Sequence, residues 1–314
     1  MNRSRTGQLI AAVVALALLT AVLLFMVLNQ GGEPAATGSP TPSVPPTAEP
    51  TPGATLNEEM LSRRLTVLVV GLDTNEARRE AGHGVNTDTL MLASVNADQS
   101  EVTLISLPRD SVDIPMADGS TWERKVNAIY SDRGVDELVG AMEALFDVPI
   151  DGYLQVDMDD LATLVDAAGG VTVSPDGPLA DPIVDLDLQP GEQELNGATA
   201  LAYVRTRVDT DYGRAARQQE VLLDLVSRLV SPETDVDVAQ LLSGLDSFET
   251  SLPLDDLPTL LEIGRRAQDA RVTRQVLEPP EFITFEGDAG DGRGYILLPD
   301  VEAIRDFTAE ALED

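Results

Sequence analysis

Four arginines, Arg205, Arg207, Arg214 and Arg217, stand close together in an otherwise acidic chain. A guanidinium group donates paired hydrogen bonds to phosphate oxygens. If a helix begins at Arg214, then Arg217 and Gln218 share one face with it, and the helix N-terminus adds its positive dipole end. Arg205 and Arg207 would share one side of an extended segment. We therefore expect these side chains to converge on one bound anion. The alternative is a solvated helix whose arginines pair with neighbouring carboxylates, namely Asp209, Asp211 and Glu220.

Two aspartates stand at the ends of apolar segments. Asp73 closely follows the apolar run 65–70, and Asp88 opens the run 89–95. Ligands of open α/β sheets bind beyond the C-terminal ends of strands, and Asp88 lies near Asp73 if the two strands are neighbours. Two carboxylates, a few waters and a phosphate group make a typical site for Mg²⁺ or Mn²⁺. The alternative for either residue is an aspartate that starts a turn or caps a helix.

Two further basic residues follow the next apolar run. Arg109 comes directly after the run 102–107, which places it at the same predicted edge. Lys125 is the only lysine of the chain, and it shares a short segment with Asn127. Lys125 would act as a point charge for phosphate. The alternatives are a surface ion pair between Arg109 and Asp110, and a surface lysine near a helix start.

The composition excludes several kinds of chemistry. The formal net charge is −33, from 54 acidic and 21 basic side chains, so nucleic acid is not an expected partner. There is no cysteine, which excludes disulfides, thiolate metal sites and cysteine nucleophiles. The one histidine, His83, lies between glycines in a segment typical of a flexible loop. A multi-histidine metal site is therefore impossible, and a Ser-His-Asp triad is disfavoured.

Strands and helices are predicted to alternate along the rest of the chain. Short apolar or β-branched runs predict strands at 65–70, 89–95, 102–107, 153–156, 171–173, 271–276 and 294–298. Helical spacing predicts helices at 136–146, 158–168, 197–203, 214–229, 236–245, 254–267 and 300–312. Residues 96–100 read as a hairpin connection. The predicted class is α/β, with a mixed central β-sheet flanked by helices on both faces.

The first 57 residues are predicted to lie outside the folded domain. The unbroken apolar run 9–28 is long enough to span a bilayer as one transmembrane signal-anchor helix, and Arg3 and Arg5 precede it. Residues 1–8 are then cytoplasmic and the folded part of the chain is extracytoplasmic, as in a single-pass protein of the cell membrane. Residues 29–57 are rich in Pro and Thr and predict an extended linker. A cleaved signal peptide is the alternative.

In this order, the motifs resemble those of the LytR-CpsA-Psr family. The matching segments are Gly71-Leu72-Asp73, Asn86-Thr87-Asp88, Pro108-Arg109-Asp110-Ser111, Lys125 to Tyr130, and Ala200 to Gln218. Many members carry arginine where this chain has Asn86. The resemblance covers about 65–230, so residues 58–230 are predicted to form the catalytic domain. Residues 231–314 are predicted to be a C-terminal α/β extension packed on the same domain.

The resemblance implies a phosphotransferase that moves a glycopolymer of teichoic acid, capsule or arabinogalactan type from a polyprenyl-pyrophosphate carrier to peptidoglycan. It implies Mg²⁺ held by Asp73 and Asp88, and an apolar tunnel for the lipid. The expected catalytic residues are Asp73, Asp88, Arg109 and Arg207. The expected pyrophosphate-binding residues are Arg109, Lys125, Asn127, Arg205, Arg207, Arg214, Arg217 and Gln218.

Other readings of the same residues stay open. Asp73, Asp88 and Asp110 are all candidates to accept the proton of the attacking hydroxyl. A metal-dependent polyprenyl-pyrophosphate hydrolase would use the same groups with water as the acceptor. A non-enzymatic sensor or regulator bound to the envelope would need none of the arginines for chemistry.

Overall fold

The computed structural model describes residues 56–73, 85–231 and 249–313, and its centre is a six-stranded sheet. The strand order is β11-β6-β1-β2-β3-β12. The bounds are Leu65–Leu72 for β1, Thr87–Val95 for β2, Glu101–Ser106 for β3, Gly152–Val156 for β6, Glu249–Thr250 for β11 and Arg271–Val276 for β12. β1 pairs in parallel with β6, as β3 does with β12, and the other pairs are antiparallel. The prediction of a mixed sheet is confirmed.

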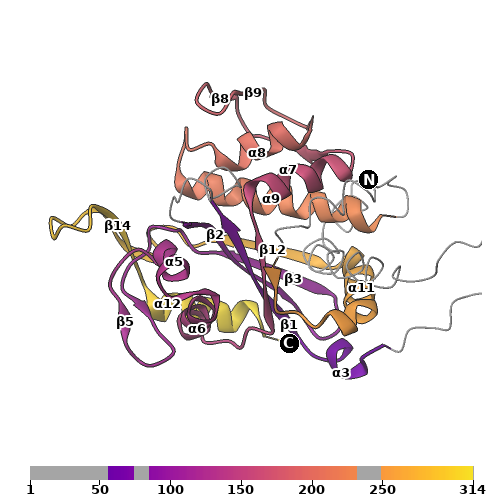
Figure 1. Ribbon diagram of the computed structural model, residues 1–314, viewed down its shortest axis with the longest axis horizontal. Coiled ribbons are helices and arrows are strands. Elements are labelled where there is room, and N and C mark those ends of the chain that lie inside the picture. The colour runs from indigo at the N-terminus through magenta and orange to yellow at the C-terminus, as the bar shows by residue number, and fades with distance from the viewer. Residues whose placement is uncertain (1–55, 74–84, 232–248, 314) are drawn as a thin grey trace, which may run out of the picture.

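Helices cover both faces of this sheet (Figure 1). One face packs against α7, α8, α9 and α11, which span Met158–Ala167, Gly197–Arg205, Asp211–Val230 and Leu257–Arg266. The other face packs against α5, α6 and α12, which span Ile129–Arg133, Val135–Phe146 and Val301–Ala311. Successive strand side chains point to opposite faces. In β1, Val67 and Val69 therefore belong to one apolar core, while Leu68 and Val70 belong to the other.

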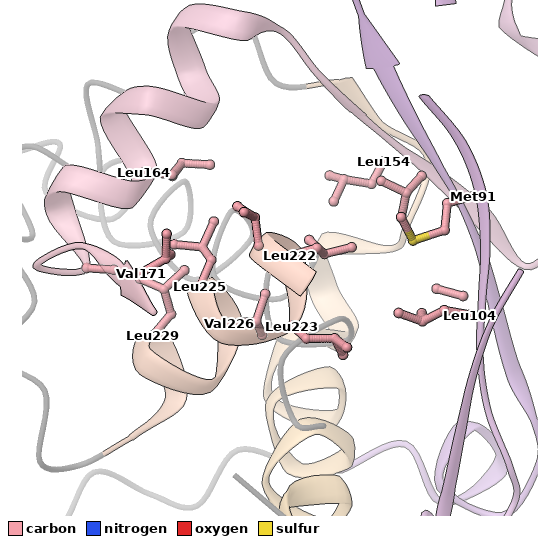
Figure 2. Close-up of a cluster of buried hydrophobic side chains, with 14 of the residues drawn as sticks. Met91, Leu104, Leu154, Leu164, Val171, Leu222, Leu223, Leu225, Val226 and Leu229 are labelled. Atoms are coloured by element: carbon pink, nitrogen blue, oxygen red, sulfur yellow. The ribbon is translucent and has the colours of Figure 1, made fainter. Parts of the chain in front are cut away.

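Helix α9 is docked on the sheet by an apolar stripe. Leu222, Leu225, Val226 and Leu229 follow the spacing of one helix face, and Figure 2 shows them gathered near Leu164 of α7. Burying one such side chain is worth roughly 1.5–3 kcal/mol, so the stripe fixes α9 firmly. This orientation matters because the first turns of α9 carry part of the predicted anion site.

Short elements join these layers. They are α3 (Glu58–Leu61), β4 (Ile114–Pro115), β5 (Thr121–Trp122), β7 (Val171–Val173), β8 (Leu179–Asp181), β9 (Leu186–Leu188), β10 (Gln193–Leu195), β13 (Ile283–Asp288), β14 (Tyr295–Pro299), and 3-10 turns at Val126–Ala128, Leu254–Asp256 and Ala267–Asp269. β7 pairs with β10, β4 with β5, β8 with β9, and β13 with β14. Of these strands, only β7 and β14 match strands predicted from the sequence.

Several predictions lie outside the described residues. They concern the cytoplasmic residues 1–8, the span 9–28, almost all of the linker 29–57, the loop at His83, and the helix 236–245. Within the described ranges, no helix is both long and apolar enough to cross a bilayer. The division of the chain at residue 230 stays a prediction, although β11 and β12, which follow it, are strands of the central sheet.

Candidate functional site

A cavity of about 270 Å³ lies between the sheet and helices α7, α8 and α9. Its walls are mainly apolar, and they include Val69, Met91, Leu161, Leu201 and Leu222. The polar lining residues are Asp73, Asp88, Thr89, Asp157, Arg205, Arg207, Arg214 and Gln218, and most of them lie at or near the ends of elements. β1 ends and β2 begins at the same edge of the sheet, because the two strands are antiparallel neighbours with Leu72 opposite Thr87. Asp73 and Asp88 therefore line one cavity, as their positions predicted.

Three arginines converge on the carboxylate of Asp88. Arg109 Nη1 lies 2.5 Å from Asp88 Oδ1, while Arg207 Nη2 and Arg214 Nη1 lie 3.1 and 3.3 Å from Oδ2. Arg109 follows β3, Arg207 lies between α8 and α9, and Arg214 lies in the first turns of α9. Three guanidinium groups of like charge repel one another unless an anion lies between them. The group is therefore built to hold an anion, and here one carboxylate serves all three.

Arg214 is the most deeply buried of the three, with 4% of its surface exposed. Burial lowers the pKa of Arg214, and the neighbouring positive charge of Arg207 lowers it further. Within the described residues, the Nε atoms of Arg214 and Arg109 are buried and have no hydrogen-bond partner. A buried donor without a partner is unfavourable, so both groups have capacity for a further oxygen ligand.

Asp211 belongs to the site, although the sequence indicates it only as a possible surface partner of the arginines. Its Oδ1 lies 3.3 Å from Arg214 Nη2 and 3.6 Å from Arg207 Nε. Helix α9 begins at Asp211 and is capped by Thr210, which accepts from the backbone N–H of Gly213. The expectation that the helix begins at Arg214 is wrong. The i,i+3 spacing of Asp211 and Arg214 is the sequence feature that indicates their contact, and it is the pairing that the solvated-helix alternative describes.

Arg109 contacts Asp88, Asp110 and the backbone of Asn127, and it is not among the described residues that line the cavity. Burial lowers the pKa of Arg109, but Asp88 and then Asp110 outweigh it, so the pKa is raised overall. Lys125 Nζ lies 3.1 Å from Asp110 Oδ1. The backbone N–H of Asn127 donates to the carbonyl oxygen of Arg109 at 3.3 Å. Lys125 and Asn127 are also absent from the described residues that line the cavity, and they contact Asp110 and Arg109 instead.

Arg205 and Gln218 complete the polar part of the lining. Arg205 is the last residue of α8, not part of an extended segment as expected, and it is exposed. Within the described ranges Arg205 forms no ion pair. Gln218 Nε2 donates to the carbonyl oxygen of Val204 at 3.3 Å. Arg205 is therefore free to meet a ligand that enters the cavity.

Arg217 is another predicted site residue that the structure does not bring into this group. Its Nε donates to the carbonyl oxygen of Tyr203 at 3.0 Å, and its Nη2 donates to that of Thr206 at 2.6 Å. Its Nη1 lies 2.6 Å from Asp209 Oδ2. The side chain thus ties α9 to the segment after α8. Gly213 belongs to the same arrangement, because a Cβ there would lie 2.2 Å from Asp209 Oδ2.

Arg217→Ala is therefore expected to act on stability. We expect the variant to lose about 1–3 kcal/mol of unfolding free energy, because backbone carbonyls in a buried region lose their donor. The matched control is Arg205→Ala, which removes an exposed arginine nearby and is expected to change the value by less than about 0.5 kcal/mol. Urea titration of the full chain measures both. Equal losses in the two variants would contradict the positioning role of Arg217.

The carboxylates suit a hard divalent cation. Asp73 and Asp88 line the same cavity and offer oxygen ligands. The described residues contain no cluster of three or more His, Cys, Asp or Glu side chains able to hold a metal ion. Mg²⁺ commonly uses one or two carboxylates and takes its remaining ligands from waters and substrate phosphates. The donor set therefore fits Mg²⁺ bound together with a phosphate-containing ligand.

Fold and site together define a class of protein: an α/β domain with an arginine-rich anion site at the polar end of an apolar cavity. A sequence model of the LytR_cpsA_psr family matches residues 45–292. The chain belongs to the LytR-CpsA-Psr family, which confirms the resemblance of its motifs.

Individual relatives agree with this assignment. The chain is similar to the polyisoprenyl-teichoic acid–peptidoglycan teichoic acid transferase TagU of Enterococcus faecalis, with 30% identity over 246 residues that cover 76% of each chain. It is 28% identical over 257 residues to biofilm regulatory protein A of Streptococcus mutans, where the match covers 76% of this chain and 61% of that protein. The crystal structure of Bacillus subtilis TagV matches with a TM-score of 0.62 and 25% identity, over 80% of this chain and 98% of that one.

Proposed function

We propose that this protein transfers a glycopolymer of teichoic acid, capsule or arabinogalactan type from a polyprenyl-pyrophosphate carrier to peptidoglycan. The observation that carries the proposal is the convergence of Arg109, Arg207 and Arg214 on Asp88, which lines the polar end of a mainly apolar cavity together with Arg207 and Arg214. A lipid-linked diphosphate has the matching chemistry, since its charged head suits the arginines and its hydrocarbon chain suits the apolar walls. The name of the Enterococcus relative, a teichoic acid transferase, supports the same reaction class.

Binding would exchange one anion for another. In the structure, the three arginines share the Asp88 carboxylate. A diphosphate carries more charge and more acceptor oxygens than one carboxylate, so it offers each guanidinium a better partner. The buried Nε atoms of Arg109 and Arg214 then gain acceptors as well. Arg205, which is exposed at the same cavity, adds a fourth positive charge.

In the proposed reaction, the arginines stabilise the negative charge that develops when the diphosphate bond breaks. The hydroxyl oxygen of the acceptor attacks the phosphorus that carries the glycan, and the bond from this phosphorus to the bridging oxygen breaks. The products are a glycan–peptidoglycan phosphodiester and polyprenyl phosphate. Negative charge gathers on the leaving phosphate, where fixed guanidinium groups stabilise it without reorganising. The hydroxyl proton passes to a carboxylate of the site, for which Asp73, Asp88 and Asp110 are the candidates.

We further propose that Asp73 and Asp88 hold Mg²⁺, or Mn²⁺, when the substrate binds. The ion would supply neutralisation of the charge that develops on the diphosphate. Once the arginines turn from Asp88 to the substrate, the Asp88 oxygens become available as metal ligands. In this order of events, Asp88 would pair with the arginines before the substrate binds and with the metal ion afterwards.

The proposed substrates also require that the described domain lies at the outer face of the cell membrane. We propose that residues 9–28 anchor the protein in the cell membrane and that the described domain is extracytoplasmic. A lipid carrier and peptidoglycan meet only there, and the apolar run with its preceding arginines supports this orientation.

The test uses the full-length chain in detergent with lipid-linked glycan, a peptidoglycan acceptor and Mg²⁺. Mass spectrometry is expected to find the glycan–peptidoglycan phosphodiester together with polyprenyl phosphate. Donor cleavage with water as the acceptor, whether or not peptidoglycan is supplied, would assign the site to a hydrolase. An intact donor under all conditions would leave the chain a binding protein without this activity.

A further inference from the structure

Two tyrosines and a glutamate beside the arginine group have no part in the reaction described above. The hydroxyl of Tyr212, in the first turn of α9, donates to Glu286 Oε2 at 3.0 Å. The hydroxyl of Tyr295, the first residue of β14, donates to Glu286 Oε1. One carboxylate of β13 thus holds two phenol groups from different elements.

This cluster adjoins the arginine group on two sides. Tyr212 directly follows Asp211, whose carboxylate contacts Arg207 and Arg214. The backbone of β14 runs beside the segment after Arg109, since Leu297 N–H donates to the Asp110 carbonyl at 3.1 Å. The C-terminal hairpin β13–β14 therefore forms a wall next to the proposed diphosphate site.

The wall presents an aromatic ring and acceptor oxygens to solvent. Tyr295 is 48% exposed, and Glu286 is also exposed. The hairpin register pairs Glu286 with Leu297 and Asp288 with Tyr295, so Glu286, Asp288 and Tyr295 point to one face. The hydrogen bond to Glu286 holds the Tyr295 hydroxyl in place, and it raises the pKa of Tyr295 to about 12.

These groups suit a neutral sugar better than another phosphate. A pyranose has a C–H face that packs on an aromatic ring, and it has hydroxyl groups that donate to carboxylate oxygens. Glu286 and Asp288 repel an additional anion at this face. Both substrates of the proposed reaction carry sugar rings close to the reacting phosphorus.

We propose that Tyr212, Glu286 and Tyr295 form a subsite for a pyranose ring next to the diphosphate. This inference rests on the proposed transferase function. The ring comes either from the donor, as the sugar attached to the diphosphate, or from the peptidoglycan acceptor. In both cases the subsite gives the C-terminal hairpin a role in placing a glycan at the reacting phosphorus.

The kinetic test compares Tyr295→Ala with Phe285→Ala in the full-length chain. Phe285 is a matched control, because it is 40% exposed on the same hairpin but points to the opposite face. Donor and acceptor concentrations are varied separately. We expect Tyr295→Ala to raise the KM of one of them by about 5–10-fold, which identifies the source of the ring. Tyr295→Phe keeps the ring and is expected to raise it less, and Phe285→Ala should leave both values unchanged.

A binding measurement keeps the inference testable without turnover. Saturation-transfer NMR is run with a soluble peptidoglycan disaccharide and, separately, with the soluble donor sugar. We expect saturation of the C–H protons of one of these two ligands by the wild-type chain and by Phe285→Ala, and weaker saturation by Tyr295→Ala. Unchanged KM values for both substrates, together with no difference in saturation among the variants, would overturn the subsite. A lowered thermal midpoint in Tyr295→Ala with both KM values unchanged would make the cluster a structural tie only, which also overturns it. A wild-type chain that neither transfers nor cleaves the donor would instead count against the proposed function, and the NMR result alone would then decide on the subsite.

Discussion

Replacement of Arg207 by alanine is expected to lower the kcat of glycopolymer transfer by about 10²–10³-fold, the usual cost of removing one fixed donor from a developing oxyanion. Arg207 lies between α8 and α9, lines the cavity, and reaches Asp88 at 3.1 Å. Its side chain is 42% exposed, so its loss leaves the core intact. The effect should therefore fall on turnover, with a change in unfolding free energy below about 0.5 kcal/mol.

The control for this variant is Arg265→Ala. Arg265 lies on α11, is 67% exposed, and pairs with Glu262 three residues earlier. Exposed pairs of this kind contribute little to stability. Turnover by Arg265→Ala should equal that of the wild type. A similar loss in both variants, or full activity of Arg207→Ala, would show that the arginine group is not where charge develops.

Asp88→Asn is expected to give the largest combined effect on stability and ligand binding. The three arginines then lose the carboxylate that separates them, and two of them are mostly buried. We expect a loss of about 1–3 kcal/mol in unfolding free energy. Inorganic pyrophosphate without divalent metal should bind the variant more tightly than the wild type, by about tenfold, because the competing carboxylate charge has gone.

Added Mg²⁺ should reverse that order. The wild type should gain pyrophosphate affinity with Mg²⁺ and the variant should not, since one proposed metal ligand is missing. Asp132→Asn is the control, because Asp132 pairs only at the surface with Arg124, whose side chain is 62% exposed. Calorimetric titration with and without EDTA measures both effects. Pyrophosphate affinity that is the same in all three proteins would contradict the shared role of Asp88.

Much of the central sheet could be predicted from apolar runs alone. The strands at 65–70, 89–95 and 102–107 are buried on both faces, so their sequences are mostly apolar, interrupted only by Thr and Ser. The hairpin β13–β14 gave a weaker signal, because Thr284, Phe285, Glu286 and Asp288 are exposed and leave no apolar pattern in β13. Its first strand was missed for that reason, and so was the cluster of Tyr212, Glu286 and Tyr295.

The arginine group was predicted only in part, because residue types do not show which arginines bond to the backbone. Arg109, Arg207 and Arg214 were recognised because each follows a predicted element or lies in a dense basic motif. Arg217 has the same motif signal, but its partners are the carbonyl oxygens of Tyr203 and Thr206 together with the carboxylate of Asp209, which the solvated-helix alternative included. Backbone acceptors leave no trace in residue types, so spacing on a helix could not separate Arg217 from Arg214. The helix start at Asp211 was misplaced because the Thr210 cap was not recognised.

A crystal structure of residues 56–313 with a short-chain prenyl pyrophosphate and Mg²⁺ tests the central claim most directly. We predict diphosphate oxygens within hydrogen-bonding distance of Arg109, Arg207 and Arg214, with the prenyl chain between Met91 and Leu222 in the apolar cavity. A diphosphate bound on another face, with the three guanidinium groups still paired to Asp88, would contradict it.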